Sequence, residues 1–182
     1  MSDFLGETTD LLSRTPVVLR ALLGGLPESW GATQDVEGGW RPRDVVGHLI
    51  TTELDNWIPR TKRLLEHGTD KAFDQIDRFK HVGRDDDQTL DQLVDRFVEL
   101  RGQSLAALRE LATEADLDRK GLHAALGEVT LRELLATWTA HDLDHISQIF
   151  AGMAGSRDAA VGPFKVYLGI LLRRDDPSAV PG

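Results

Sequence analysis

The stretch from Trp138 to Ile149 reads WTAHDLDHISQI and carries two histidines, His141 and His145. On an α-helix, residues four apart lie on one face, with Cβ atoms about 5–6 Å apart. Leu134 and Ile149 fall on the same face, so we expect the histidine pair to point into an apolar core. Two inward imidazoles at this spacing could share one metal ion.

A third histidine, His48, lies in the segment Trp40–Leu49, which reads WRPRDVVGHL and begins a second predicted helix at Pro42. If this helix packs beside the first, the three histidines form one metal site. The alternative is that each histidine hydrogen-bonds within the core, because a buried imidazole without a partner is costly.

Three neutral imidazoles suit zinc, nickel or ferrous iron better than magnesium or calcium, and manganese is also accommodated. Three protein ligands leave coordination positions open, which is typical of a reactive site. Asp55, Asp142 and Gln148 are candidates to hydrogen-bond to the histidine rings and fix their tautomers. Each of the three could equally make an interhelical hydrogen bond with no role at a metal.

The remaining histidines give weaker signals. His123 could reach the mouth of the site from a loop. His67 and His81 lie in polar surroundings, so we expect both to be exposed and assign them no role. Beyond the metal ligands, the sequence identifies no catalytic residue.

Four long apolar stripes with helical spacing predict an all-α four-helix bundle. The expected helices span residues 2–24, 42–67, 90–111 and 130–152, followed by a short extra helix at 163–173. The connections at 69–88 and 113–129 are expected to be irregular, the first of them a solvated loop, and no strand is expected. We expect a single domain over residues 1–175 and a flexible tail over 176–182.

Helix boundaries follow from local signals. Thr89 with Gln92 and Thr130 with Glu133 form capping boxes. Pro16 interrupts the first helix and predicts a bend near residues 14–15 or a restart there, and Pro59 predicts a bend in the second helix.

Composition narrows the classes of partner. The chain has 182 residues and a net charge of −9, which argues against a nucleic acid or an anionic membrane as a partner. It has no cysteine, so any thiol in its chemistry would come from a small molecule. No signal segment and no apolar run of about 20 residues is evident, so we expect a cytoplasmic protein.

Two motifs resemble those of the DinB/YfiT-like superfamily: Trp40-x-Pro42 with His48-Leu49, and Trp138-x-x-His141-Asp142-x-x-His145-x-x-Gln148-Ile149. The resemblance covers most of the chain. It implies a bundle of up-down-down-up connectivity, a divalent metal bound by His48, His141 and His145, and a homodimer formed through bundle faces. Arg41 stands where the family usually has a capping Ser or Thr.

The resemblance leaves the activity open. Some members of the family are transferases that use a low-molecular-weight thiol such as mycothiol, bacillithiol or glutathione, which implies an S-transferase that detoxifies electrophilic small molecules. A second reading is a non-catalytic, stress- or damage-inducible metal-binding dimer in which bulky side chains such as Trp138 or Phe150 close the site. A third is a metal-dependent hydrolase, and a fourth is a plain bundle without metal, whose histidines are satisfied by Asp55 and Asp142.

Overall fold

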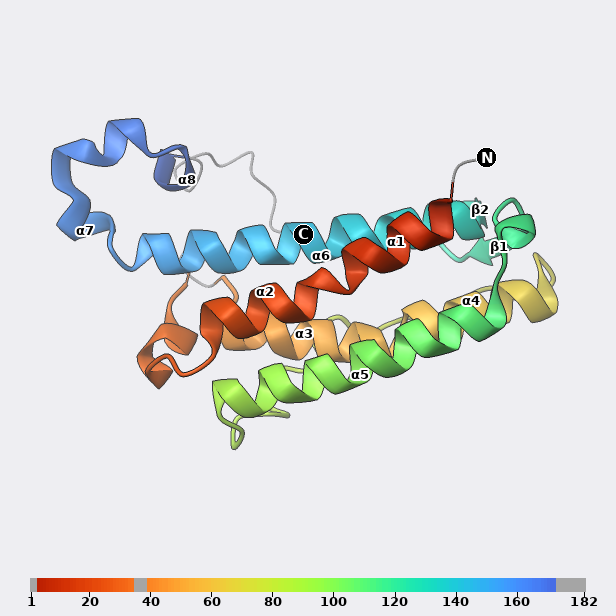
Figure 1. The fold of residues 1–182 in the computed structure, drawn as a ribbon, viewed down its shortest axis with the longest axis horizontal. Helices are drawn as coiled ribbons and strands as arrows, with labels where there is room; N and C mark the ends of the chain where they lie inside the picture. The colour runs from red at the N-terminus through yellow and green to blue at the C-terminus, as the bar shows by residue number, and fades with distance from the viewer. Residues whose placement is uncertain (1–2, 35–38, 173–182) are drawn as a thin grey trace.

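The computed structural model describes residues 3–34 and 39–172, which form a helical bundle with one small hairpin (Figure 1). The α-helices are α1 (Phe4–Leu12), α2 (Arg14–Leu23), α3 (Pro42–Asp55), α4 (Trp57–His67), α5 (Leu90–Leu111), α6 (Leu131–Gly155), α7 (Asp158–Val161) and α8 (Gly169–Leu172). The strands are β1 (Lys120–His123) and β2 (Gly127–Thr130), and short 3-10 turns span Glu28–Ala32, Glu114–Asp116 and Gly162–Tyr167. The tail expected at 176–182 lies outside the described residues.

The four bundle helices are α1–α2, α3–α4, α5 and α6. The first packs against α5 and α6, and the second also packs against α5 and α6, so these two pairs lie diagonally opposite. Figure 1 shows α1–α2 and α6 running one way and α3–α4 and α5 running the other way. The expected up-down-down-up connectivity is therefore confirmed.

The core consists of two apolar clusters, one in each half of the bundle. One cluster contains Trp57 and Trp138, and the other contains Phe97 and Ile149. Arg101 lies between the clusters, because its guanidinium carbon is 4.9 Å from the ring centre of Phe97 and 5.2 Å from that of Trp138.

No helix among the described residues is long and apolar enough to cross a membrane.

Arg101, on α5, is 1% exposed and contacts the other three bundle helices. From α5 its guanidinium donates to Glu53 on α3 at 2.7 Å, to Asp142 on α6 at 2.5 Å and to the carbonyl of Leu12 on α1 at 2.9 Å. The hydroxyl of Thr15 on α2 donates to Asp142 at 2.6 Å. A cation buried at this depth needs these acceptors to offset the loss of hydration.

Both predicted proline bends lie further upstream than the sequence suggested. The first helix breaks at Ser13, three residues before Pro16, and the second breaks at Asn56, three residues before Pro59. A proline ring clashes with the carbonyl of the residue four positions earlier and leaves that carbonyl without its helical N–H. The strain therefore falls at the preceding turn, and the helix restarts directly after the break.

The connection at 113–129 contains structure that the sequence analysis did not predict. Strands β1 and β2 pair antiparallel, and β1 also accepts a hydrogen bond from the backbone N–H of Phe73 to the carbonyl of Leu122 at 2.8 Å. Each strand has only four residues, too few for the alternation of apolar and polar side chains to stand out. The expectation of no strand was wrong.

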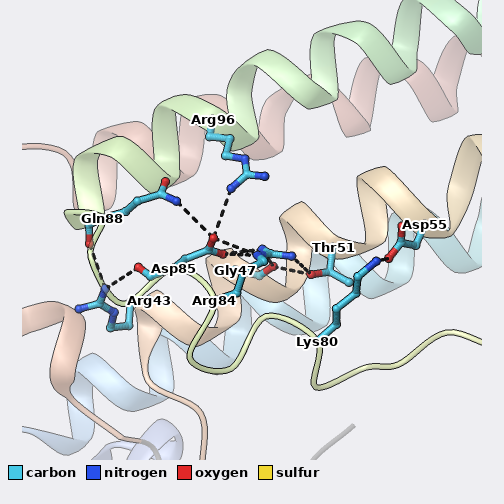
Figure 2. Close-up of polar contacts among 9 residues, drawn as sticks. All are labelled: Arg43, Gly47, Thr51, Asp55, Lys80, Arg84, Asp85, Gln88 and Arg96. Carbon is cyan, nitrogen blue, oxygen red and sulfur yellow. Dashed lines mark hydrogen bonds and ion pairs between the residues drawn. The ribbon is translucent and has the colours of Figure 1, made fainter.

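The connection between α4 and α5 is a crossover segment, residues 68–89, that returns along the bundle because these neighbouring helices are parallel. It is not the solvated loop expected, since Phe73, His81 and Asp85 are 4%, 3% and 6% exposed. Figure 2 shows Asp85 at the centre of a polar cluster, where it pairs with Arg84 and Arg96.

The same cluster ties the crossover segment to α3. The guanidinium of Arg84 donates to the hydroxyl of Thr51 at 3.0 Å, and that of Arg43 donates to the carbonyl of Gln88 at 3.0 Å (Figure 2). The segment is thereby held across the face of α3 that carries His48.

The chain after the bundle also differs from expectation. The fourth helix reaches Gly155 rather than residue 152, and the single helix expected at 163–173 is instead a 3-10 turn over Gly162–Tyr167 followed by α8. Leu168, between the two, has a φ of −114° and a ψ of 87°, which is not a helical conformation and so divides the expected helix.

Candidate metal centre

Helices α3 and α6 run antiparallel side by side and bring three histidines together. The Nε2 atom of His141 is 3.1 Å from Nε2 of His48 and 3.2 Å from Nε2 of His145. Each of the three offers one ring nitrogen, and these atoms all lie within 4.8 Å of one another. The i,i+4 spacing on α6 sets one pair, and the packing of α3 against α6 adds the third ring.

The second nitrogens of two rings fix their tautomers. Nδ1 of His48 faces the backbone carbonyl of Arg78 at 3.3 Å, and Nδ1 of His145 faces Oε1 of Gln148 at 3.0 Å. Both oxygens can only accept, so each Nδ1 carries the hydrogen and each Nε2 presents a lone pair. Two lone pairs therefore point toward Nε2 of His141, which can donate at most one hydrogen.

Burial keeps the three rings neutral. Burial, and to a smaller extent the charge of His145 when protonated, lowers the pKa of His48 to about 3 and that of His141 to about 2. Burial also lowers the pKa of His145, against the hydrogen bond to Gln148, which raises it. Neutral imidazole is the form that binds a metal ion.

Aromatic rings enclose the histidines. The ring of Trp40 lies 4.7 Å from that of His48 and stacks on that of His145 at 6.0 Å, centre to centre. The ring of Trp57 meets that of His141 edge-on at 5.1 Å. These rings restrict the access of water to the nitrogens and lower the local polarity, which strengthens electrostatic interactions at the centre.

The donor set fits a divalent transition metal. Lone pairs converge on one point, and no acidic side chain joins the group of ring nitrogens among the described residues. Nδ1 of His141 is buried without a hydrogen-bond partner in the same part of the chain. Three imidazoles without carboxylate favour zinc, nickel or ferrous iron over magnesium or calcium.

Of the three predicted supporting residues, the structure places one against a histidine. Gln148 contacts His145, as above. Asp142 instead binds Arg101 and Thr15, and Asp55 is paired with Lys80 at 2.7 Å (Figure 2). The two carboxylates therefore make the interhelical or surface contacts that the sequence analysis left open, and neither satisfies a histidine ring.

His81 was wrongly expected to be exposed. It is 3% exposed, its ring lies 4.8 Å from that of Trp40 and 5.6 Å from that of His48, and neither of its nitrogens has a partner among the described residues. The local sequence is polar, so only the path of the crossover segment accounts for this burial. His67 is exposed, as expected.

His123 lies in the β-hairpin, outside the group of converging nitrogens. Its Nδ1 accepts from the backbone N–H groups of Ala125 and Leu126 at 3.2 Å, and its ring meets that of Phe73. It shapes the hairpin turn and a cavity beside α4.

The absence of a capping Ser or Thr at position 41 is compensated. The carboxylate of Asp44 accepts from the backbone N–H of Arg41 at 2.9 Å, and the two side chains also pair at 2.7 Å. The start of α3, and with it the orientation of His48, is held by a side chain from inside the helix.

Comparisons with known proteins agree with this architecture. The sequence profile of the DinB superfamily matches residues 11–149. A protein from Bacillus licheniformis, provisionally named a metal-dependent hydrolase, is 32% identical over 142 residues, covering 77% of this chain and 80% of its own. The solved structure of YfiT from Bacillus subtilis, also provisionally described as a metal-dependent hydrolase with an unusual four-helix bundle topology, has a TM-score of 0.72 at 24% identity. That likeness covers 82% of this chain and 86% of YfiT.

Proposed function

Because the chain belongs to the DinB superfamily, we propose that it binds one divalent metal ion through His48, His141 and His145 and uses it in catalysis. The observation that carries this proposal is the convergence of three Nε2 atoms, two of them with lone pairs fixed by their Nδ1 contacts. When bound, the metal would lower the pKa of a thiol or water in its open position and so supply a nucleophile at neutral pH.

The surrounding residues prepare the site. Gln148 and the carbonyl of Arg78 hold two imidazoles in the tautomer that presents Nε2. Trp40 and Trp57 provide apolar walls, which exclude bulk water and suit a substrate with apolar character.

The reaction that we propose first is transfer of a low-molecular-weight thiol, such as mycothiol, bacillithiol or glutathione, to an electrophilic small molecule. The chain contains no cysteine, so the sulfur nucleophile comes from the co-substrate. In this reaction the thiol sulfur forms a bond to the electrophilic carbon, the bond from that carbon to its leaving group breaks with the electron pair going to the leaving group, and the thiol proton goes to solvent or to the leaving group. The test is turnover of each thiol with an electrophilic acceptor such as a chloro-dinitroarene by the metal-loaded protein.

Hydrolysis is the second candidate, supported by the descriptions of the two relatives. Here water attacks an ester or amide carbonyl carbon, the acyl C–O or C–N bond breaks, and the alcohol or amine leaves with a proton from water, so no thiol is needed. Assays of the same metal-loaded preparation on activated esters, with and without thiol, separate the two reactions. Thiol-dependent turnover supports transfer, thiol-independent release of acid supports hydrolysis, and the absence of both supports the non-catalytic metal-binding dimer.

A homodimer is part of the proposal. An apolar groove of about 570 Å³ lies between α2, α6 and α8, and Leu143 and Phe150 at its edge are 51% and 40% exposed. Trp138 and Phe150 were the side chains expected to close the metal site in the non-catalytic reading. Phe150 lies in this groove, and Trp138 stacks on Trp57 in the core. Among the described residues, neither side chain makes a ring contact with the three histidines. Sedimentation should give a dimer for the wild type and a monomer for Phe150→Asp, and a monomeric wild type would contradict this assignment.

A further inference from the structure

A cavity next to the β-hairpin has none of the three clustered histidines in its lining, so metal binding does not explain it. It measures about 290 Å³ and opens between α4, the crossover segment and the β-hairpin. Its lining includes Arg60, Phe73, Asp74, Gln75, Ile76 and His123.

The guanidinium of Arg60 is fixed in this cavity, but not all of its hydrogen-bond donors have partners among the described residues. Its guanidinium lies over the ring of Phe73 at 5.3 Å, which fixes its position. Nε is buried without a hydrogen-bond partner among the described residues, and one terminal nitrogen reaches the carbonyl of Asp74 at only 3.4 Å. A guanidinium has five N–H donors, so the side chain retains capacity for an acceptor from outside the protein.

His123 provides a second donor. Its Nδ1 accepts from two backbone N–H groups, so the neutral ring carries its hydrogen on Nε2. Burial, together with the nearby charge of Arg60, lowers the pKa of His123. The ring is therefore a neutral N–H donor close to a cation.

The charge balance of the cavity favours an anion. Asp74 is the acidic residue in its lining, but its carboxylate pairs with Arg63 from the next turn of α4. The negative charge of Asp74 also acts on Arg60, but the two guanidinium groups share this one carboxylate, so a net positive charge remains beside the cavity in a chain whose net charge is −9. A site with a local excess of positive charge attracts anions through its local field, even in a protein whose overall charge is negative.

Two connections tie the cavity to the histidines. Trp57, whose ring meets His141, precedes Arg60 by three residues of α4, an axial rise of about 4.5 Å. Ile76 lines the cavity, and two residues later the carbonyl of Arg78 faces His48. The cavity and the histidine group are thus contacted by neighbouring turns of α4 and by neighbouring residues of the crossover segment.

We propose that this cavity binds the anionic group, carboxylate or phosphate, of the small molecule that reacts at the metal centre. Arg60 makes a charge-assisted hydrogen bond to the anion, and His123 donates a second hydrogen bond from Nε2. Binding of the anion itself needs only the cavity, whereas its use in orienting a substrate rests on the proposed metal-dependent function.

The test is an NMR titration of the full chain, metal-free and metal-loaded, with acetate, with inorganic phosphate and with neutral acetamide at constant ionic strength. We expect saturable shifts of the His123 ring and of Arg60 Nε–H with at least one anion in both forms, and none with acetamide. Comparison of the acetate and phosphate arms identifies which anionic group is preferred. Equal responses to acetamide, or anion binding in the metal-loaded form alone, would overturn the proposal.

Substitutions test whether Arg60 and His123 are the residues that bind the anion. Arg60→Gln should weaken anion binding by at least about tenfold, and His123→Gln by less, since it removes a neutral donor. Lys62→Gln is the matched control, because it removes an exposed positive charge from the same helix and should leave the affinity unchanged. Unchanged affinity in Arg60→Gln would contradict the assignment. Metal content, measured on the same samples, shows separately whether the metal centre has failed.

Discussion

The three histidines differ in what holds the nitrogen that does not face the centre. A side chain, Gln148, holds His145; a backbone carbonyl holds His48; and Nδ1 of His141 has no partner among the described residues. Gln148 is therefore the contact that a substitution can remove without altering a ligand.

We expect Gln148→Leu to weaken metal binding by about 10–100-fold, because the hydrogen bond fixes the tautomer and orientation of His145. A competition titration against a chromophoric chelator measures the change. Gln103→Leu, which alters an exposed glutamine on α5, is the control. An affinity for Gln148→Leu equal to that of the wild type would show that the hydrogen bond does not support the metal centre.

The histidines also make a prediction about pH for the metal-free protein. Burial lowers the pKa of His48 from 6.5 to about 3 and that of His141 from 6.5 to about 2. At a pH between 6.5 and these lowered values, the two histidines bind protons in the unfolded chain but not in the folded one. Stability should be complete above pH ~6.5 and should fall as the pH drops toward 3, by up to ~1.4 kcal/mol per pH unit for each histidine.

Urea unfolding at pH 7 and at pH 5.5 measures this loss of stability. The pH range lies above the usual pKa values of carboxylates, so their titration contributes little. The double variant His48→Gln, His141→Gln should show a smaller loss over the same range. If wild type and double variant respond alike, the two histidines are not the source of the acid sensitivity.

At the residue scale, the sequence predicted the inward face of His141 and His145 because helical periodicity is a local property. It could not place His81, whose burial depends on a segment that folds back over α3. It also could not assign Asp142, because Arg101, its partner, lies 41 residues away on another helix.

At the scale of elements, Arg101 is the side chain that joins the four bundle helices. Burial alone would lower its pKa, but the charges of Asp142 and Glu53 outweigh that effect and raise it. Burial raises the pKa of Glu53, although Arg101 opposes the change. The network thus depends on the cation being present.

Arg101→Met should lower the free energy of unfolding by about 3–5 kcal/mol, because it leaves Asp142 and Glu53 buried without a counter-charge. Urea unfolding provides the measurement. Arg20→Met is the matched control, since Arg20 pairs with Asp95 on the surface, where such pairs contribute about 1 kcal/mol or less. Equal losses in the two variants would contradict the structural role of the network.

The element boundaries show where local sequence is sufficient. The capping boxes at Thr89 and Thr130 begin α5 and α6 as predicted, because their hydrogen bonds lie within four residues. The two proline breaks were predicted, but the first lies one or two residues before its predicted position and the second lies three residues before Pro59. The β-hairpin was missed, since its strands are short and are stabilised by packing against α4 and by a contact with the crossover segment.

At the scale of the molecule, the up-down-down-up order has a direct consequence for the centre. Because α4 and α5 are parallel neighbours, the chain between them must return along the bundle, and this return places Arg78 and His81 beside the site. The order itself was implied by the resemblance of two motifs to a known family. The contacts of the crossover segment had no local signal and required the structure.

A metal that joins α3 to α6 should stabilise the whole fold. Binding to the folded chain alone raises the free energy of unfolding by about 2.7 kcal/mol at a free metal concentration 100 times the dissociation constant. Thermal unfolding with and without added zinc or nickel measures the effect. His67→Ala, at an exposed histidine, should keep the stabilisation, and its loss in that variant would indicate binding elsewhere.

The most direct measurement is the metal content of the purified chain, by elemental analysis, for the wild type and for His48→Ala, His141→Ala and His145→Ala, with circular dichroism to establish folding. The wild type should hold one zinc, nickel, iron or manganese ion per chain, and each folded variant should hold much less. A wild type that binds no metal after loading, or a His48→Ala variant that retains its full content, would contradict the three-histidine centre between α3 and α6.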